Sequence, residues 1–279
     1  MTPQRTTWAR VVGIVFGVMT TTVVGAVAQT PERAGVAGFP PLLANPREPA
    51  FFATYVWDHS TRLASRLATV GLGQTISLIE SGRWEVAVAA GVFSQFNMES
   101  PTNDLINADY LVGLPVVYHR GSFATRFQVY HQSSHLGDEY MLHTGIQRAD
   151  LTFESAELLF SQATVAWRIY GGGEYAFARS PSDLKPACLR AGLEYRGAHA
   201  VARLGRLTTG RLVAGLDVAS AQFRAWQPAW SFVSGLEMTA PGSTWRWSVL
   251  LKAYTGPAPF GQFYRDHLSS LGGGISFAR

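Results

Sequence analysis

The chain has few charged residues, a single cysteine and no long apolar run beyond its first segment. Of its 279 residues only 15% are charged, and the one cysteine is Cys188. One cysteine cannot form an intrachain disulfide, so we interpret Cys188 as a small packing residue. After residue 28 no run approaches the roughly 20 uninterrupted apolar residues that a transmembrane helix needs. Disulfide scaffolds and helical membrane proteins are therefore excluded.

Clustered basic charge is also lacking. The formal net charge is +4, and Arg5 and Arg10 at the start of the chain supply two of these charges. A nucleic-acid interface would need a patch or stripe of Lys and Arg. We therefore expect no nucleic-acid partner.

The start of the chain is typical of exported proteins. Arg5 and Arg10 precede an apolar run over 11–18, and Ala26-Val27-Ala28 supplies the small residues of a cleavage site. This pattern predicts a secretory signal peptide over residues 1–28. The next segment, 29–50, holds five prolines, which argue against regular structure and predict a periplasmic Pro-rich arm.

From residue 51 onward, apolar and polar residues alternate with a period of two. In 84–96 one face carries Trp84, Val86 and Val88, whereas the other includes Arg83 and Glu85. Such alternation indicates β-strands with one apolar face. The same pattern recurs in 106–118, 165–177, 187–196, 245–255 and the last strand before the C-terminus.

These strands fit a lipid-embedded barrel. Several run for about 10 to 14 residues, longer than the usual five or six, with Trp and Tyr near the ends of their apolar faces. Tight turns at 81–82, 120–121, 162–163 and 241–242 alternate with longer joins at 98–104, 136–149, 179–186 and 256–267. Lipid requires every backbone polar group to be paired, so the sheet must close. We predict an all-β, closed antiparallel transmembrane β-barrel over 51–279 in the cell outer membrane. It has about 12 strands if 51–57 is the first, and ten is the alternative.

A soluble β-sandwich or lipocalin-like barrel would place the apolar face inside instead. Small residues on the polar face, such as Gly91, Gly172 and Gly274, suit a crowded barrel interior better than a solvated surface. We therefore expect the polar face to point inward and to form an ion-pair network, with a narrow pore lining as the alternative. The residues expected inside are Asn107, Asp109, Arg126, Arg168, Glu174, Arg190, Glu194, Asp217, Arg246 and Lys252.

The segment 122–140, SFATRFQVYHQSSHLGDEY, carries the candidate chemistry. Its apolar face changes to His131, Ser133 and His135 at the tip, which we place at the extracellular rim. Residues two apart on a strand share a face, so His131 could act as base for a Ser133 nucleophile. Asp138 or Glu139 in the following loop could orient the histidine.

Two other interpretations of this tip stay open. The side chains could form a hydrogen-bonded cluster under the loop or contact lipopolysaccharide. Alternatively, His131, His135, Asp138 and Glu139 could bind a metal ion, although no metal-binding motif fits their spacing. We expect no cofactor.

Several stretches resemble an uncharacterised family of bacterial outer-membrane proteins known as a domain of unknown function. They are LINADYLVGLP (105–115), YHQSSHLGDEY (130–140), GGGEY (171–175) and GPAPFGQFY (256–264). The resemblance implies an outer-membrane barrel and no particular activity. Partners would be outer-membrane lipids, lipopolysaccharide and the barrel-assembly machinery.

The residues 131–133 are also similar, locally, to the outer-membrane phospholipase family. That family carries a strand segment His-Gln-Ser-Asn-Gly, whose His and Ser act as base and nucleophile; lipid A deacylases likewise place His and Ser two apart on a strand. Here His131-Gln132-Ser133 matches, but Ser134-His135 replaces the Asn-Gly. No counterpart of the segment with the third catalytic member and the calcium ligands is found in the sequence. Three functions follow: a structural or interaction role, a lipid hydrolase, or a narrow pore.

Overall fold

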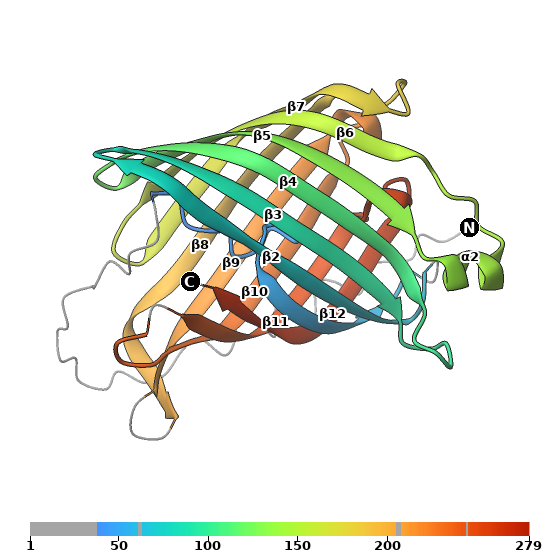
Figure 1. Cartoon of the computed structure of the whole chain (residues 1–279). Helices are drawn as coiled ribbons and strands as arrows, with labels where there is room; N and C mark the ends of the chain where they lie inside the picture. Colours follow the sequence, from blue (N-terminus) through green and yellow to red (C-terminus); the bar gives the residue numbers. More distant parts are fainter. Residues whose placement is uncertain (1–37, 61–62, 205–207, 244, 279) are drawn as a thin grey trace, which may run out of the picture. The chain divides into compact units, whose positions relative to one another are not determined.

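A computed structural model describes residues 38–60, 63–204, 208–243 and 245–278, which form a closed barrel of antiparallel strands (Figure 1). The strands are β1 Phe51–Asp58, β2 Arg66–Ser81, β3 Trp84–Asn97, β4 Leu105–Arg120, β5 Phe123–Leu136, β6 Leu151–Ala163, β7 Trp167–Ser180, β8 Ala187–Leu204, β9 Thr208–Ala221, β10 Pro228–Thr239, β11 Arg246–Pro257 and β12 His267–Ala278. In the described joins lie the α-helix α2 (Asp138–Thr144) and the 3₁₀ turns η1 (Gln222–Arg224) and η2 (Gly261–Phe263). Among these residues no helix is long and apolar enough to cross a membrane.

The barrel closes because the first strand pairs with the last. β1 runs antiparallel to β12, with Phe51 opposite Phe277 and Asp58 opposite Ser270. Each strand therefore has two partners, and the sheet has no free edge. The prediction of twelve strands beginning at 51–57 is confirmed, and the ten-strand alternative is wrong. The predicted signal peptide, 1–28, lies outside the described residues.

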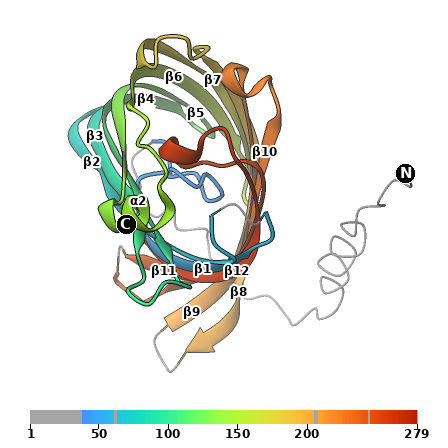
Figure 2. The same cartoon turned by 90° about the vertical axis from the view of Figure 1, so that its right-hand side faces the viewer.

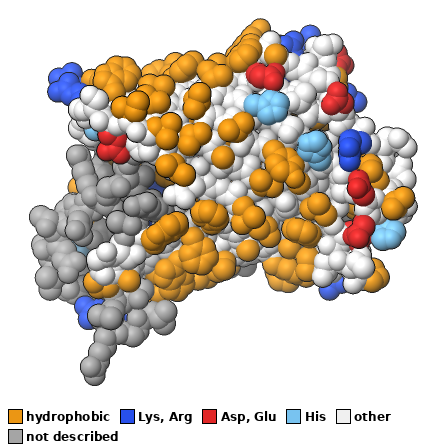
Figure 3. Space-filling model, in the orientation of Figure 1, with side chains coloured by type: hydrophobic (Ala, Val, Ile, Leu, Met, Phe, Trp, Pro, Cys, Tyr) orange, Lys and Arg blue, Asp and Glu red, His pale blue; other side chains and the backbone are white. Residues whose placement is uncertain are grey.

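The two faces of the sheet differ as predicted. Large apolar side chains point outward, and Leu72, Leu114 and Leu251 are 57%, 58% and 68% exposed. Figure 3 shows such side chains spread over the face that β2–β5 present. Inward-facing residues are polar and buried, as Asn107 (0% exposed) and Asp109 (1%) illustrate. An apolar exterior and a polar interior invert the arrangement of a soluble protein, which suits a lipid environment.

The connections between strands differ in length at the two ends of the barrel, which we call the turn end and the loop end. The turn end carries the short connections 82–83, 121–122 and 164–166, together with the described residues 240–243 and 245. The loop end carries 59–60, 63–65, 98–104, 137–150, 181–186, 222–227 and 258–266. Aromatic pairs flank the turn end on the outside: the rings of Trp84 and Tyr118, and those of Trp167 and Tyr195, lie 4.9 Å apart.

Residues 38–50, which we call the inner segment, occupy the barrel interior, where Figure 2 shows them enclosed by the strands. The Glu48 carboxylate lies 2.7 Å from the Arg126 guanidinium, and the Leu43 backbone N–H donates to Glu194 at 2.6 Å. The Phe39 ring lies 4.9 Å from the Arg126 guanidinium carbon. The prediction of a periplasmic arm is therefore wrong for 38–50. The prolines do prevent regular structure there, but the intervening apolar and acidic side chains fit the lumen.

The ion-pair network is found in part: Arg126, Arg168, Arg190, Glu194 and Asp217 form ion pairs. Asp109 and Glu174 instead accept hydrogen bonds from neutral side chains, and Lys252 lies over the Phe52 ring. Glu194 accepts hydrogen bonds from Arg168 and Arg196, each at 2.8 Å. Further pairs link Arg190 with Asp217, Arg211 with Glu237, and Arg126 with Glu157. Small residues make room for large ones: a side chain at Gly192 would collide with the ring of Tyr170.

Candidate functional site

Strand β5 presents the predicted histidines and serine on the outside of the barrel. Its burial alternates along the strand: Gln132 and Ser134 are buried in the interior, whereas His131 and His135 are exposed on the outer face. Ser133 lies between the two histidines on that face and is half-buried. The structure thus places all three side chains on the face that we predicted for them.

His131 has a carboxylate partner on the neighbouring strand. β5 pairs with β6 so that His131 lies directly opposite Glu154. The distance from His131 Nδ1 to Glu154 Oε1 is 3.0 Å, and both side chains are about two-fifths exposed (44% and 40%). This contact leaves His131 Nε2 available for another partner. A carboxylate on one ring nitrogen fixes the tautomer and orientation that a general base needs.

Ser133 stands beside this pair. It lies opposite Tyr110 of β4 and Thr152 of β6. No hydrogen bond joins Ser133 to His131 within the described residues. The two side chains share the outer face of β5, and catalytic hydrogen bonds are often long before substrate binds. The three residue types and their order, Ser–His–Glu, correspond to a nucleophile, a base and an orienting acid.

The carboxylates expected to orient His131 lie elsewhere. Asp138 and Glu139 begin α2 and are exposed. Asp138 Oδ1 lies 3.4 Å from an Arg148 guanidinium nitrogen. The His135 ring packs edge-on against the Tyr110 ring, with ring centroids 5.5 Å apart. The carboxylate in contact with His131 is Glu154 instead.

The metal hypothesis gains no support from the geometry. His131 contacts Glu154, His135 packs against Tyr110, and Asp138 contacts Arg148. Among the described ranges, no group of three or more His, Cys, Asp or Glu side chains is suited to hold a metal ion.

Sequence reasoning missed Glu154, although a signal exists. The outward-facing residues that follow it on β6 are Ala156, Leu158 and Phe160. One carboxylate at the head of an apolar face needs a partner. The alternation over 151–163 predicts that Glu154 points outward. It does not predict the strand register that places Glu154 opposite His131.

A groove on the outer face leads to the site. Its walls come from β2, β3 and β4, and His131 lies at its margin. The apolar side chains along it include Leu72, Ile76, Val92 and Val112. The groove is shallow and open, and neither Ser133 nor Glu154 lines it.

The loop end is tied together beside these strands. Tyr140 of α2 packs edge-on against Phe263 of η2, with ring centroids 6.0 Å apart. His143 Nδ1 lies 2.6 Å from Asp104 Oδ2 in the β3–β4 loop. Hydrogen bonds from Thr102 and then His143 hold the pKa of Asp104 below its ordinary value.

The barrel is similar to solved outer-membrane barrels. Outer membrane phospholipase A from Escherichia coli has 10% sequence identity and a TM-score of 0.59, covering 84% of this chain and 93% of its own. The outer membrane phospholipase of Salmonella typhi, solved as a dimer with bound calcium, has 10% identity and a TM-score of 0.57, covering 83% and 92%. At such identity the likeness concerns the fold alone.

No curated protein matches the sequence. The family model described as "Protein of unknown function (DUF1207)" matches residues 17–278, so the chain belongs to that family.

Proposed function

We propose that this protein is an outer-membrane acyl-ester hydrolase that acts on membrane lipids, with Ser133 as nucleophile, His131 as base and Glu154 as orienting group. The observation that carries the proposal is the 3.0 Å contact of His131 Nδ1 with Glu154 Oε1 beside Ser133, on the outer face of the barrel. An enzyme that acts on lipid in place needs its reactive groups on this surface. Partners under this proposal are outer-leaflet lipids and lipopolysaccharide, and the barrel-assembly machinery would insert the chain.

The proposed reaction passes through an acyl-serine in two steps. His131 Nε2 takes the proton from Ser133 Oγ, which attacks the ester carbonyl carbon and forms a tetrahedral intermediate. The intermediate collapses to an acyl-serine as His131 returns the proton to the departing alcohol. Water, activated by His131, then releases the fatty acid. Glu154 stabilises the imidazolium that forms in both steps.

The groove supports a lipid substrate. An ester bound at Ser133 would place its acyl chain along the surface that Leu72, Ile76 and Val112 line. Because this face suits a lipid environment, the acyl chain of a membrane lipid reaches it without crossing water.

The test is hydrolysis of phospholipid and of lipid A by full-length protein folded in detergent micelles. We expect Ser133→Ala to lower the hydrolysis rate at least about 1000-fold, as removal of a nucleophile does in serine hydrolases. His135→Gln changes a neighbouring histidine on the same face and serves as the matched control, with an unchanged rate. Equal rates for the native protein and Ser133→Ala would refute the proposal.

A pore is the weaker candidate, because the inner segment and the ion pairs occupy the lumen. A purely structural or interaction role would leave the pairing of His131 with Glu154 without a chemical task.

A further inference from the structure

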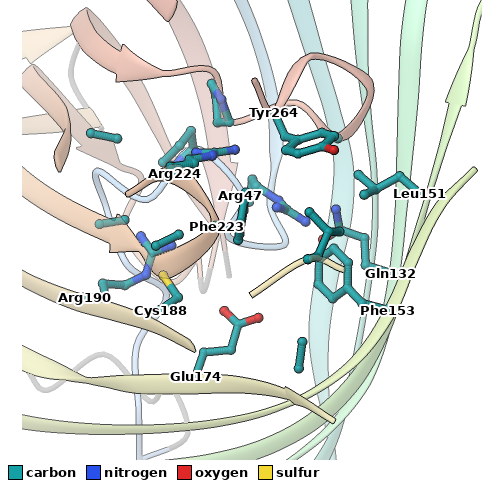
Figure 4. A pocket seen from close by; sticks show the side chains of 18 of the residues that line it. Arg47, Gln132, Leu151, Phe153, Glu174, Cys188, Arg190, Phe223, Arg224 and Tyr264 are labelled. Atoms are coloured by element: carbon teal, nitrogen blue, oxygen red, sulfur yellow. The ribbon is translucent and has the colours of Figure 1, made fainter. Parts of the chain in front are cut away.

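A cavity of about 120 Å³ lies inside the barrel, in the half near the loop end. The candidate hydrolase site lies on the outside of the barrel. Figure 4 shows side chains converging on it from separate elements: Arg47 of the inner segment, Gln132 of β5, Glu174 of β7, Arg190 of β8 and Arg224 of η1. A space of this size holds several water molecules or one small organic ion.

Gln132 is buried on the wall of this cavity without a hydrogen-bond partner. It is 1% exposed, and neither its amide nitrogen nor its amide oxygen has a partner among the described residues. A buried polar group without a partner is unfavourable. Figure 4 shows the side chain at the cavity, so a polar occupant would satisfy it.

The charges around the cavity favour an anion. Five cationic side chains line it against two carboxylates; they are Arg47, Arg179, Lys185, Arg190 and Arg224, with Glu174 and Asp217. Both carboxylates already have partners. Asp217 is bound by Arg190 and by the Tyr170 hydroxyl, and Glu174 accepts a hydrogen bond from the Tyr130 hydroxyl at 2.6 Å.

Two of the guanidinium groups retain free donors. Within the described residues Arg47 makes no side-chain hydrogen bond or ion pair, and its guanidinium carbon lies 6.0 Å from the centre of the Phe153 ring. Arg224 donates to the backbone oxygens of Pro257 and Ala258, while its Nε has no partner. Guanidinium groups with free N–H donors suit planar or tetrahedral oxyanions.

We propose that this cavity binds a small soluble oxyanion, a phosphate or a short carboxylate, through Arg47, Arg224 and the Gln132 amide. Arg47 comes from the inner segment, and Arg224 comes from η1 at the loop end. The site is separate from the hydrolase proposed above, because Gln132 points inward while its neighbours His131 and Ser133 point outward.

The experiment is titration calorimetry of full-length protein, folded in nonionic detergent, with inorganic phosphate and with succinate at constant ionic strength. Saturable binding of either probe is expected. Arg47→Gln and Gln132→Leu should each weaken it at least tenfold. Arg211→Gln is the matched control, since Arg211 pairs with Glu237 outside the cavity and its loss should leave the affinity unchanged.

A heat-dependent shift in gel mobility will show whether each variant is folded. If Arg47→Gln does not fold, Gln132→Glu provides the second test, because it keeps the side-chain size and adds a negative charge that should abolish phosphate binding. Absence of saturable binding, or equal affinity in all cavity variants, would overturn the proposal. Ser133→Ala should bind the anion as the native protein does, so failure of the hydrolase proposal remains distinguishable.

Discussion

At the scale of single residues, Glu154 is the informative position. It stands on a face whose next outward side chains are Ala156, Leu158 and Phe160. A carboxylate on a lipid-facing surface is unfavourable unless it is paired or lies near the interface. His131 at 3.0 Å is the partner that the described structure provides. A polar pair in this position is more readily explained by a chemical task than by stability.

Glu154→Gln separates these two explanations. The amide keeps the size of the side chain but loses the charge that stabilises an imidazolium, so we expect lipid hydrolysis to fall about 100- to 10,000-fold. Thermal stability should change little, because a half-exposed pair contributes about 0–1 kcal/mol. Thr152→Val, two residues earlier on the same face, should retain activity. If Glu154→Gln lowers thermal stability but leaves lipid hydrolysis unchanged, the His131–Glu154 pair has a structural role.

His131 and Ser133 could be predicted from their spacing alone, because a strand puts residues two apart on one face. Glu154 could not. The 14-residue join 137–150 separates the two strands, and its folded path sets the register that brings Glu154 opposite His131. Asp138 and Glu139 are nearer to His131 in sequence but lie in the short helix α2, where Asp138 contacts Arg148.

At the scale of elements, α2 is fastened to the β3–β4 loop by a titratable contact. The carboxylate of Asp104 is hydrogen-bonded by Thr102 and His143, and its pKa is lower in the folded protein than in the unfolded chain. Such a group contributes stability at pH values above its unfolded pKa, near 3.9, and loses that contribution as the pH falls through its folded pKa.

We therefore expect the contact between α2 and this loop to weaken below about pH 4. Hydrogen exchange of the α2 amides, corrected for the intrinsic effect of pH, should show reduced protection at acid pH. Asp104→Asn should reduce protection at neutral pH and remove most of the pH dependence. Identical pH profiles for Asp104→Asn and the native chain would show that another group controls α2.

The inner segment makes a second prediction at this scale. Arg126 is buried between Glu48 and Glu157 at 2.7 and 3.0 Å. Glu48→Gln leaves Arg126 one carboxylate, so we expect unfolding to become easier by about 1–3 kcal/mol, the cost of losing one charged hydrogen bond. Denaturant titration followed by gel mobility measures this. Arg66→Gln, whose partner Glu99 is exposed, is the control and should lie within about 0.5 kcal/mol of the native protein.

The sequence predicted this segment only in part. Its prolines correctly exclude helix and strand, but the placement of Phe39, Leu42 and Ala44 against the wall depends on a lumen that only the closed barrel creates. Local pattern carries no information about such a surface. The barrel wall was predictable because alternation with period two recurs in each strand and the long and short joins alternate.

At the scale of the whole molecule, the inner segment determines whether the barrel conducts. The wall residues that hold it have partners of their own: Arg126 keeps Glu157, and Glu194 keeps Arg168 and Arg196. Deletion of residues 38–49 should therefore leave a folded barrel while emptying the part of the lumen that Phe39, Leu42 and Glu48 fill. We expect the full chain to give no steady conductance in planar bilayers and the deletion variant to conduct ions. The proposed reactive side chains of the outer-face site come from β5 and β6, outside the inner segment, so lipid hydrolysis by the folded deletion variant should persist. A conducting full chain, or a folded deletion variant that stays closed, would show that another element controls the lumen.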